Sequence, residues 1–109
     1  MNGDSYSDDL AGRVRVRMSH LADMTERPVM SGLGFFLSDR LAVAIFDDRL
    51  CLRVDEDGDT AVLETVAAHP FEFAGRPVPG WFCIKAVDLD EASLARWVDQ
   101  GVASLGLPM

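Results

Sequence analysis

The chain has 109 residues, of which 49% are hydrophobic and 26% charged, and this composition suits one globular domain rather than two. Its 18 acidic residues outnumber its 10 basic residues, which gives a formal net charge of −8. Such a charge repels phosphate backbones and anionic lipid, so direct nucleic-acid binding and membrane binding are not expected.

The chain opens with a polar, acidic segment and shows no secretory leader pattern. We expect residues 1–7 to be flexible and residues 8–109 to form the single domain. No apolar stretch reaches the roughly 18 residues that a membrane span requires. The two cysteines, Cys51 and Cys83, fit no metal-ligand spacing. We therefore expect a cytoplasmic protein with free thiols and with no cofactor or metal.

The first patterned stretch, residues 8–24, is predicted to be a helix. Its apolar residues recur every three or four positions and form one stripe: Leu10, Val14, Met18 and Leu21. Ser7 is a suitable N-cap. Pro28 prevents the helix from continuing, because proline has no N–H to donate.

Three strands are predicted next, at residues 29–37, 41–46 and 50–54, with links short enough for hairpins. The third alternates, and it places Arg49, Cys51 and Arg53 on one face. The first two are apolar on both faces. In the first, Met30, Gly32, Gly34 and Phe36 oppose Leu33, Phe35 and Leu37. In the second, Leu41, Val43 and Ile45 oppose Ala42, Ala44 and Phe46. Both faces of this hairpin must therefore be covered.

The remaining chain predicts a helix at residues 60–68, strands at 71–73 and 81–85 with a loop at 75–80 between them, and a last helix. Asp88 or Asp90 caps this helix and Gly106 ends it. Its apolar stripe consists of Leu94, Trp97, Val98, Gly101 and Leu105.

This order predicts a two-layer α+β fold, α-β-β-β-α-β-β-α, with a five-stranded antiparallel sheet. Three helices can cover one face of such a sheet and leave the other apolar face open. A monomer rarely exposes a patch of that kind to water. We therefore expect a homodimer that buries the helix-free sheet face.

Two motifs have a simpler structural interpretation. If Gly58 is placed at the glycine of a calcium loop, Arg53 occupies the first ligand position, so the acidic turn at residues 55–59 is better explained as a helix cap. Gly32 and Gly34 lack the third glycine of a nucleotide-binding motif, and a strand follows them where a helix would be needed. Close packing within the sheet is the favoured interpretation of these glycines.

Three arginines, Arg13, Arg15 and Arg17, could form a basic patch, but no aromatic residue is interleaved with them for base stacking. A solvated helix face that pairs with Asp9 is favoured over nucleic-acid contact. Neither histidine, His20 or His69, belongs to a recognisable catalytic motif. Cys51 is the one residue that suggests reactivity, since Arg49 and Arg53 beside it would lower the pKa of its thiol.

Several segments together resemble the N-terminal domain of the TfoX/Sxy family. They are RPVMSGLGFF at residues 27–36, LCLRVDE at 50–56, PFEF at 70–73, GRPV at 75–78, WF at 81–82, and the stretch 94–98 with Trp97. The resemblance spans residues 10–105. Met30 and Ser31 stand where this family usually has Phe-Gly, and Cys51 stands where an aromatic residue is usual.

The resemblance implies a fold similar to that of secretion chaperones, which dimerise. Two-domain members of the family regulate competence genes together with a transcription regulator, and their C-terminal domain is not expected in a chain that ends at Met109. We therefore expect a non-catalytic protein-interaction domain in transcriptional regulation. The alternative is a small-molecule-binding or enzymatic domain with a pocket near Arg27, Cys51 and Trp81. The candidate interaction or pocket residues are Arg27, Met30, Gly32, Gly34, Phe36, Cys51 and Trp81.

Overall fold

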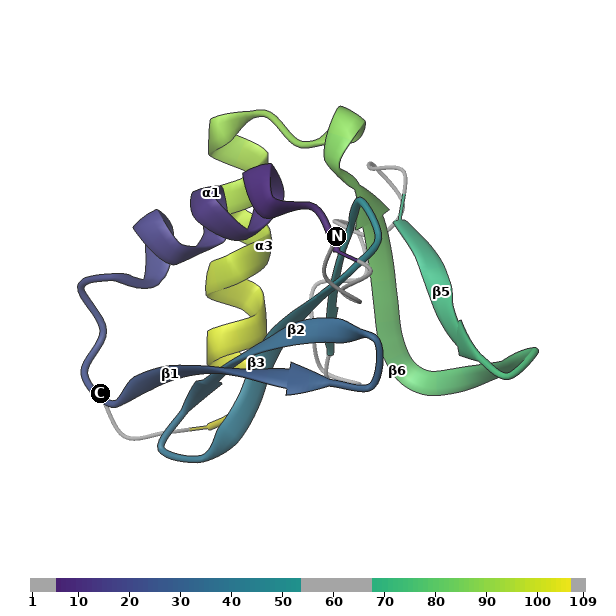
Figure 1. Ribbon diagram of the computed structural model, residues 1–109, viewed down its shortest axis with the longest axis horizontal. Coiled ribbons are helices and arrows are strands. Elements are labelled where there is room, and N and C mark those ends of the chain that lie inside the picture. Colours follow the sequence, from purple (N-terminus) through teal and green to yellow (C-terminus); the bar gives the residue numbers. More distant parts are fainter. Residues whose placement is uncertain (1–5, 54–67, 107–109) are drawn as a thin grey trace.

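The computed structural model describes residues 6–53 and 68–106 (Figure 1). These residues form an open antiparallel sheet with two α-helices, so the predicted α+β class is confirmed. The sheet has six strands in the order β1-β2-β3-β4-β6-β5, one more than predicted. The predicted helix at residues 60–68 lies outside the described residues, apart from Ala68, which begins a strand.

Helix α1 (Asp8–Met18) begins as predicted, because the Ser7 side-chain oxygen accepts a hydrogen bond of 3.1 Å from the Leu10 N–H. It ends six residues before the expected position. Leu21 lies beyond the end of the helix, in the turn that follows it, but packs on the same core. Its position therefore fits the apolar spacing of the helix although it is not helical. Tyr6, just before the helix, forms an isolated parallel bridge with Asp47.

Strands β1 (Met24–Val29) and β2 (Gly32–Leu37) form a hairpin where one strand, residues 29–37, was predicted. That prediction was wrong because Met30 and Ser31 make a turn in which Met30 adopts a φ of 54°, a conformation that is uncommon for methionine. Pro28 is accommodated because β1 is an edge strand.

Strand β3 (Arg40–Phe46) follows a two-residue turn and contains a bulge opposite β2. Phe35 pairs with Val43 while Phe36 pairs with Leu41, so Ala42 is the extra residue. Leu41 therefore lies on the face of Ala44, and Ala42 joins Val43 on the other, which corrects the predicted alternation. Strand β4 (Arg49–Arg53) alternates as predicted.

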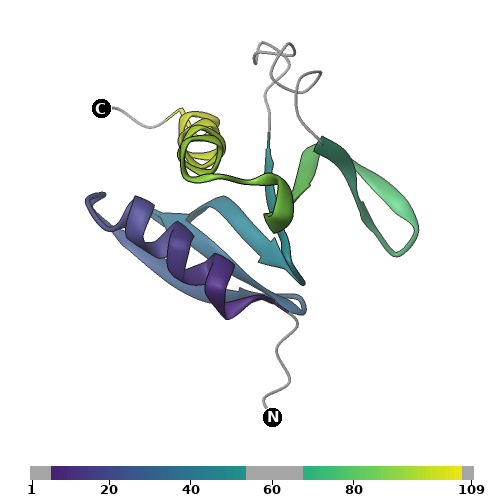
Figure 2. The ribbon, with the colours of Figure 1, turned by 90° about the horizontal axis from the view of Figure 1, so that it is seen from above.

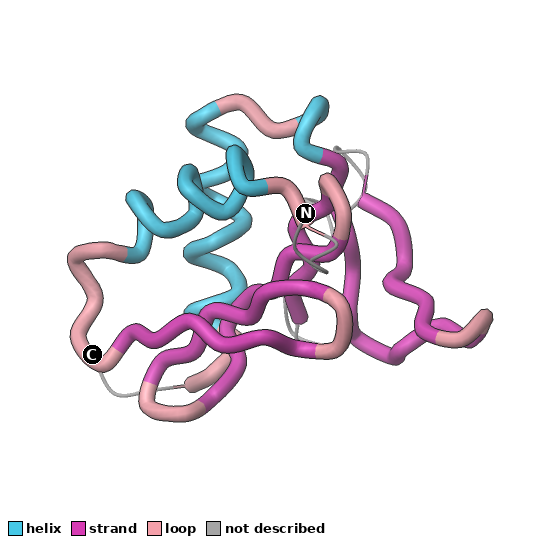
Figure 3. The backbone as a smooth tube through the Cα atoms, in the orientation of Figure 1, coloured by secondary structure: helices cyan, strands magenta, loops and turns pink. Residues whose placement is uncertain are grey.

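Strands β5 (Ala68–Phe73) and β6 (Arg76–Lys85) form the last hairpin (Figure 3). Much of the predicted loop at residues 75–80 belongs to β6, because the turn is confined to Ala74 and Gly75, with φ of 55° and 79°. Pro77, Pro79 and Gly80 gave this strand the composition of a loop. The edge strand β5 contains Pro70, so both edges of the sheet carry a proline.

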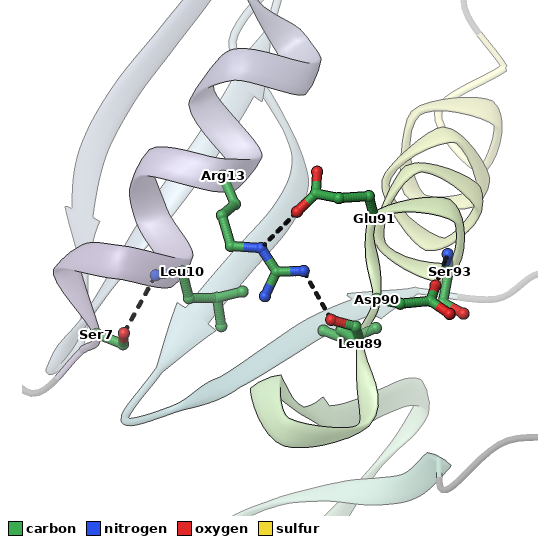
Figure 4. Close-up of polar contacts among 7 residues, drawn as sticks. All are labelled: Ser7, Leu10, Arg13, Leu89, Asp90, Glu91 and Ser93. Atoms are coloured by element: carbon green, nitrogen blue, oxygen red, sulfur yellow. Dashed lines mark hydrogen bonds and ion pairs between the residues drawn. The ribbon is translucent and has the colours of Figure 1, made fainter.

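A short 3-10 helix, η1 (Ala86–Asp88), leads to helix α3 (Glu91–Ala103), which is capped by Asp90 through a hydrogen bond of 2.7 Å from the Ser93 N–H. Figure 4 shows how Arg13 ties α1 to this region. The Arg13 guanidinium donates to the Leu89 carbonyl at 2.6 Å and to the Glu91 carboxylate at 3.1 Å. The start of α3 is thereby fixed against α1.

Both helices lie on one side of the sheet, and the β5–β6 hairpin extends away from them (Figure 2). The main core fills the space between helices and sheet. Helix α3 approaches β3 closely at Gly101, where an added Cβ would lie 2.7 Å from the Ala42 carbonyl oxygen. The main core consists of Leu10, Ala11, Val14, Met18, Leu33, Phe35, Leu37, Ala42, Val43, Ile45, Leu50, Leu52, Ile84, Leu89, Leu94, Trp97 and Val98. Among the described residues, no helix has the length and apolar character needed to cross a membrane.

Candidate functional site

The helix-free face is the face of the sheet that points away from α1 and α3. Directly paired residues of an antiparallel sheet share a face, so the strand register identifies its members. One row crosses the whole sheet and consists of Arg27, Gly34, Ala44, Cys51, Cys83 and His69. Arg27, Gly34 and Cys51 of the predicted candidates therefore lie in a single row.

At the β1 end of this row, the Arg27 guanidinium stacks on the ring of Phe36, 3.9 Å from its centroid. Gly34 leaves room for that ring, since an added Cβ would lie 2.8 Å from the Phe36 ring carbon Cε1. At Gly32 an added Cβ would lie 2.6 Å from Cδ1 of Phe46. The interpretation of both glycines as packing residues is confirmed.

The centre of the helix-free face is a second apolar cluster, made of Ala44, Phe46, Cys51, Phe71 and Cys83. Phe71 of β5 stacks on Phe46 of β3, with ring centroids 5.2 Å apart, although two strands lie between β3 and β5. The sheet therefore curves so that its last hairpin covers its own centre. What stays partly exposed is a rim made of Val29, Leu41, Val78 and Trp81.

Six of the predicted candidates are distributed along this face, namely Arg27, Gly32, Gly34, Phe36, Cys51 and Trp81. Trp81 packs on the cluster that holds Cys51. Arg27 is three strands away from Cys51 in the same row, a separation of about 14 Å at the usual strand spacing. Met30 lies at the tip of the β1–β2 turn and is 59% exposed. A cavity of about 740 Å³ lies elsewhere, between the end of α1 and α3, and is lined by residues that include Arg17, His20 and Asp99.

Cys51 faces a second thiol that sequence reasoning did not connect with it. It pairs directly with Cys83 across β4 and β6, and both cysteines are free and buried. The interaction with Cys83, together with burial, raises the pKa of Cys51. The interaction with Cys51, helped by Arg49, lowers the pKa of Cys83. The direction at Cys51 is thus opposite to the one expected from its neighbours in the sequence.

The strands of the helix-free face carry more basic than acidic side chains, and two of the basic ones have acidic partners in turns: Arg27 lies 3.6 Å from Asp39, and Arg49 lies 3.4 Å from Asp47. Arg49 pairs with Lys85, and Arg53 pairs with Trp81, on either side of the cysteine pair and on its face. The acidic residues within the described strands are Glu26 and Glu72. Glu26 bonds to Arg15 of α1, and Glu72 follows Phe71 and so points to the opposite face. No carboxylate in the described ranges pairs with Arg53 or Lys85.

The arginines of α1 are neutralised on the helix side of the sheet, by two carboxylates of α3 and one of β1. Arg13, Arg15 and Arg17 form ion pairs with Glu91, Glu26 and Asp99, and not with Asp9 as suggested from the sequence. Arg15 holds the pKa of Glu26 below its ordinary value through hydrogen bonds of 2.6 and 2.7 Å. These contacts agree with the predicted solvated helix face.

Across residues 6–53 and 68–106, no three side chains of the metal-ligating types gather into a site. The acidic turn at residues 55–59 lies outside the described residues. In the comparisons with known proteins, the sequence model of the TfoX N-terminal domain matches residues 17–105. No curated protein and no solved structure matches the chain.

Proposed function

The chain belongs to the TfoX N-terminal domain family, and we propose that it is a non-catalytic interaction domain whose helix-free face binds an acidic, partly apolar segment of another protein. The observation that carries this proposal is the distribution of charge. Arg27, Arg49, Arg53 and Lys85 share one face of a chain whose net charge is −8. A short acidic segment is the ligand that such a local field favours.

The rim of this face has the composition of a protein interface. Arginine and aromatic residues dominate binding energies at interfaces, and Arg27, Phe36 and Trp81 are partly exposed here. Stacking on Phe36 holds the Arg27 guanidinium in place before any partner arrives, which lowers the entropy lost on binding. Met30 and Val29 add apolar contact area at the β1–β2 end.

A protein fits this face better than a nucleic acid does. A duplex presents its charge over many ångströms and meets the repulsion of the whole acidic chain, whereas a short carboxylate segment lies within one screening length of about 8–10 Å and feels mainly the local cations. The resemblance to TfoX/Sxy regulators supports a transcription regulator as the class of partner.

The homodimer expected from the sequence stays a prediction, as does a pocket near Arg27, Cys51 and Trp81. Two features weigh in favour of a different partner. The centre of the face is already buried within one chain, and a symmetric pairing of two identical basic faces would bring like charges together.

The proposal can be tested by NMR titration of the labelled chain with a synthetic peptide of alternating glutamate and leucine, and with a lysine–leucine peptide of equal length as the control ligand. We expect shifts on β1, β4 and β6 with the acidic peptide, weakened by salt. Arg27→Glu and Arg53→Glu should each weaken binding about tenfold, which corresponds to about 1.4 kcal/mol.

The matched control is Arg96→Glu, which makes the same charge change at an exposed position of α3 in the helix layer. Equal weakening by all three variants would indicate a net-charge effect and contradict the proposal. Shifts confined to α1 and α3 would also contradict it. Light scattering on the chain without peptide tests the homodimer separately, because a dimer would have twice the mass of a single chain.

A further inference from the structure

The cysteine pair lies in a geometry that a disulfide can span. Cys51 and Cys83 are direct partners in an antiparallel ladder, where opposing Cα atoms are about 4.5 or 5.5 Å apart. Disulfides bridge Cα atoms that are about 4.4–6.8 Å apart. The backbone pairing therefore places the two cysteines within the range that a disulfide can bridge.

The groups around the pair favour a thiolate. On the same face, Arg49 and Lys85 form the next pair in one direction along the two strands, and Arg53 and Trp81 form the next pair in the other. His69 of β5 pairs with Cys83. Asp47, in the turn before β4, is the carboxylate that opposes this effect, and it lies 3.4 Å from Arg49. Cations beside a thiol stabilise its ionised form, which is the nucleophile in sulfur chemistry.

Access to the pair is controlled by the edge of the sheet. Cys83 is only 2% exposed and Cys51 is fully buried. The strand that borders Cys83 is β5, which is an edge strand with a neighbour on one side only. Local opening of an edge strand costs less free energy than global unfolding, so Cys83 is the thiol that an oxidant reaches first.

We propose that Cys51 and Cys83 are a site of reversible oxidation by a peroxide, which converts them into an intramolecular disulfide between β4 and β6. The Cys83 thiolate attacks one oxygen of the peroxide, the O–O bond breaks, and hydroxide leaves, which gives a sulfenic acid at Cys83. The Cys51 sulfur then attacks the sulfenic sulfur, the S–S bond forms, and the S–O bond breaks. The departing oxygen leaves as water, because it and the released hydroxide take up the protons of the two thiols.

In these two reaction steps together, the two thiols lose two electrons and one molecule of hydrogen peroxide becomes two molecules of water. A small dithiol reductant reverses the change by exchange. The competing view is that two buried cysteines merely fill space in the second apolar cluster. The two views differ in whether the thiols react together. The site does not depend on the partner proposed above.

The test is to treat the purified chain with hydrogen peroxide and to measure its intact mass and its titratable thiols in denaturant. We expect both thiols to disappear together in a monomer that has lost two hydrogens, and peptide mapping should join the segments around Cys51 and Cys83. Cys51→Ala and Cys83→Ala should instead gain oxygen or form intermolecular dimers. Wild-type chain that keeps both thiols, or gains oxygen as the single variants do, would overturn the proposal.

A second measurement needs no variant. The chain is equilibrated with reduced and oxidised glutathione, once folded and once in guanidinium chloride, where the strand register is lost. We expect the equilibrium constant for the intramolecular disulfide to be at least about tenfold larger in the folded chain, because folding holds the two sulfurs together. An equal or smaller constant in the folded chain would refute the site.

Discussion

Replacing Gly101 by alanine tests how closely α3 lies against the sheet. An added Cβ would lie 2.5 Å from Cγ1 of Val43 and 2.7 Å from the carbonyl oxygen of Ala42, where ordinary contact begins at 3.4 Å. The carbonyl belongs to the backbone of a bulged, buried strand and cannot rotate away as a side chain could. The helix must therefore retreat from β3.

The size of the effect follows from that retreat. Moving α3 by roughly 0.7–0.9 Å would forfeit a quarter to a half of the dispersion energy at each contact that it loosens. Leu94, Trp97 and Val98 lie on the same stripe and are almost fully buried. Overpacking of this kind costs about 1–3 kcal/mol, and the better helix propensity of alanine returns about 1 kcal/mol. Because one of the clashing atoms is a fixed backbone oxygen, the overpacking cost belongs at the upper end of that range, and we expect a net loss of about 2 kcal/mol.

Gly12 provides the matched control, because it lies in α1 and an added Cβ there would meet nothing within 4 Å. Gly12→Ala should raise stability by about 0.5–1 kcal/mol through helix propensity alone. Urea unfolding followed by fluorescence of the buried Trp97 gives both free energies of unfolding. A Gly101→Ala chain as stable as the wild type would show that α3 does not lie against β3 as described.

Three further predictions concern an ion pair, an aromatic stack and a turn. Glu26→Gln removes the carboxylate bound by Arg15 and should cost about 0.5 kcal/mol at neutral pH. Because folding lowers the pKa of Glu26 from 4.5, this difference should fade as pH drops through and below that value, and urea unfolding in acid checks it. Phe71→Ala should cost about 3 kcal/mol and expose Phe46 to a hydrophobic dye, since the two rings stack. A loss below about 1 kcal/mol would contradict the covered centre. Ala74→Asn should increase the free energy of unfolding by about 0.5 kcal/mol or more and so raise the thermal midpoint, because Ala74 has a φ of 55° and asparagine tolerates a positive φ better than alanine does. An unchanged or lower midpoint would contradict this assignment of the turn.

Features that depend on neighbouring residues could be predicted from the sequence. The caps at Ser7 and Asp90, the stripe of the last helix and the alternation of residues 49–53 each rest on a short-range rule of hydrogen bonding or side-chain spacing. The family resemblance of residues 10–105 agrees with the family match over residues 17–105.

Features that depend on distant strands or on unusual turns could not be predicted. The Met30–Ser31 turn contains neither glycine nor asparagine, and the segment before it contains Pro28, so the first hairpin had the pattern of one strand preceded by a loop. The bulge at Ala42 moves the Leu41 side chain to the opposite face of the sheet, and no residue pattern near it indicates a bulge. Cys51 and Cys83 meet because β4 and β6 are neighbours in the sheet, and no periodicity within either strand contains that information.

Proline in both edge strands has a consequence for how this domain can associate. A strand that adds to the edge of a sheet forms regular hydrogen bonds with the backbone N–H groups of the edge strand. Pro28 in β1 and Pro70 in β5 each lack such an N–H group. Neither border is a good template for extending the sheet into a continuous intermolecular ladder or a fibril. Assembly through the sheet is thus directed to its faces, where recognition depends on side chains and can discriminate between partners.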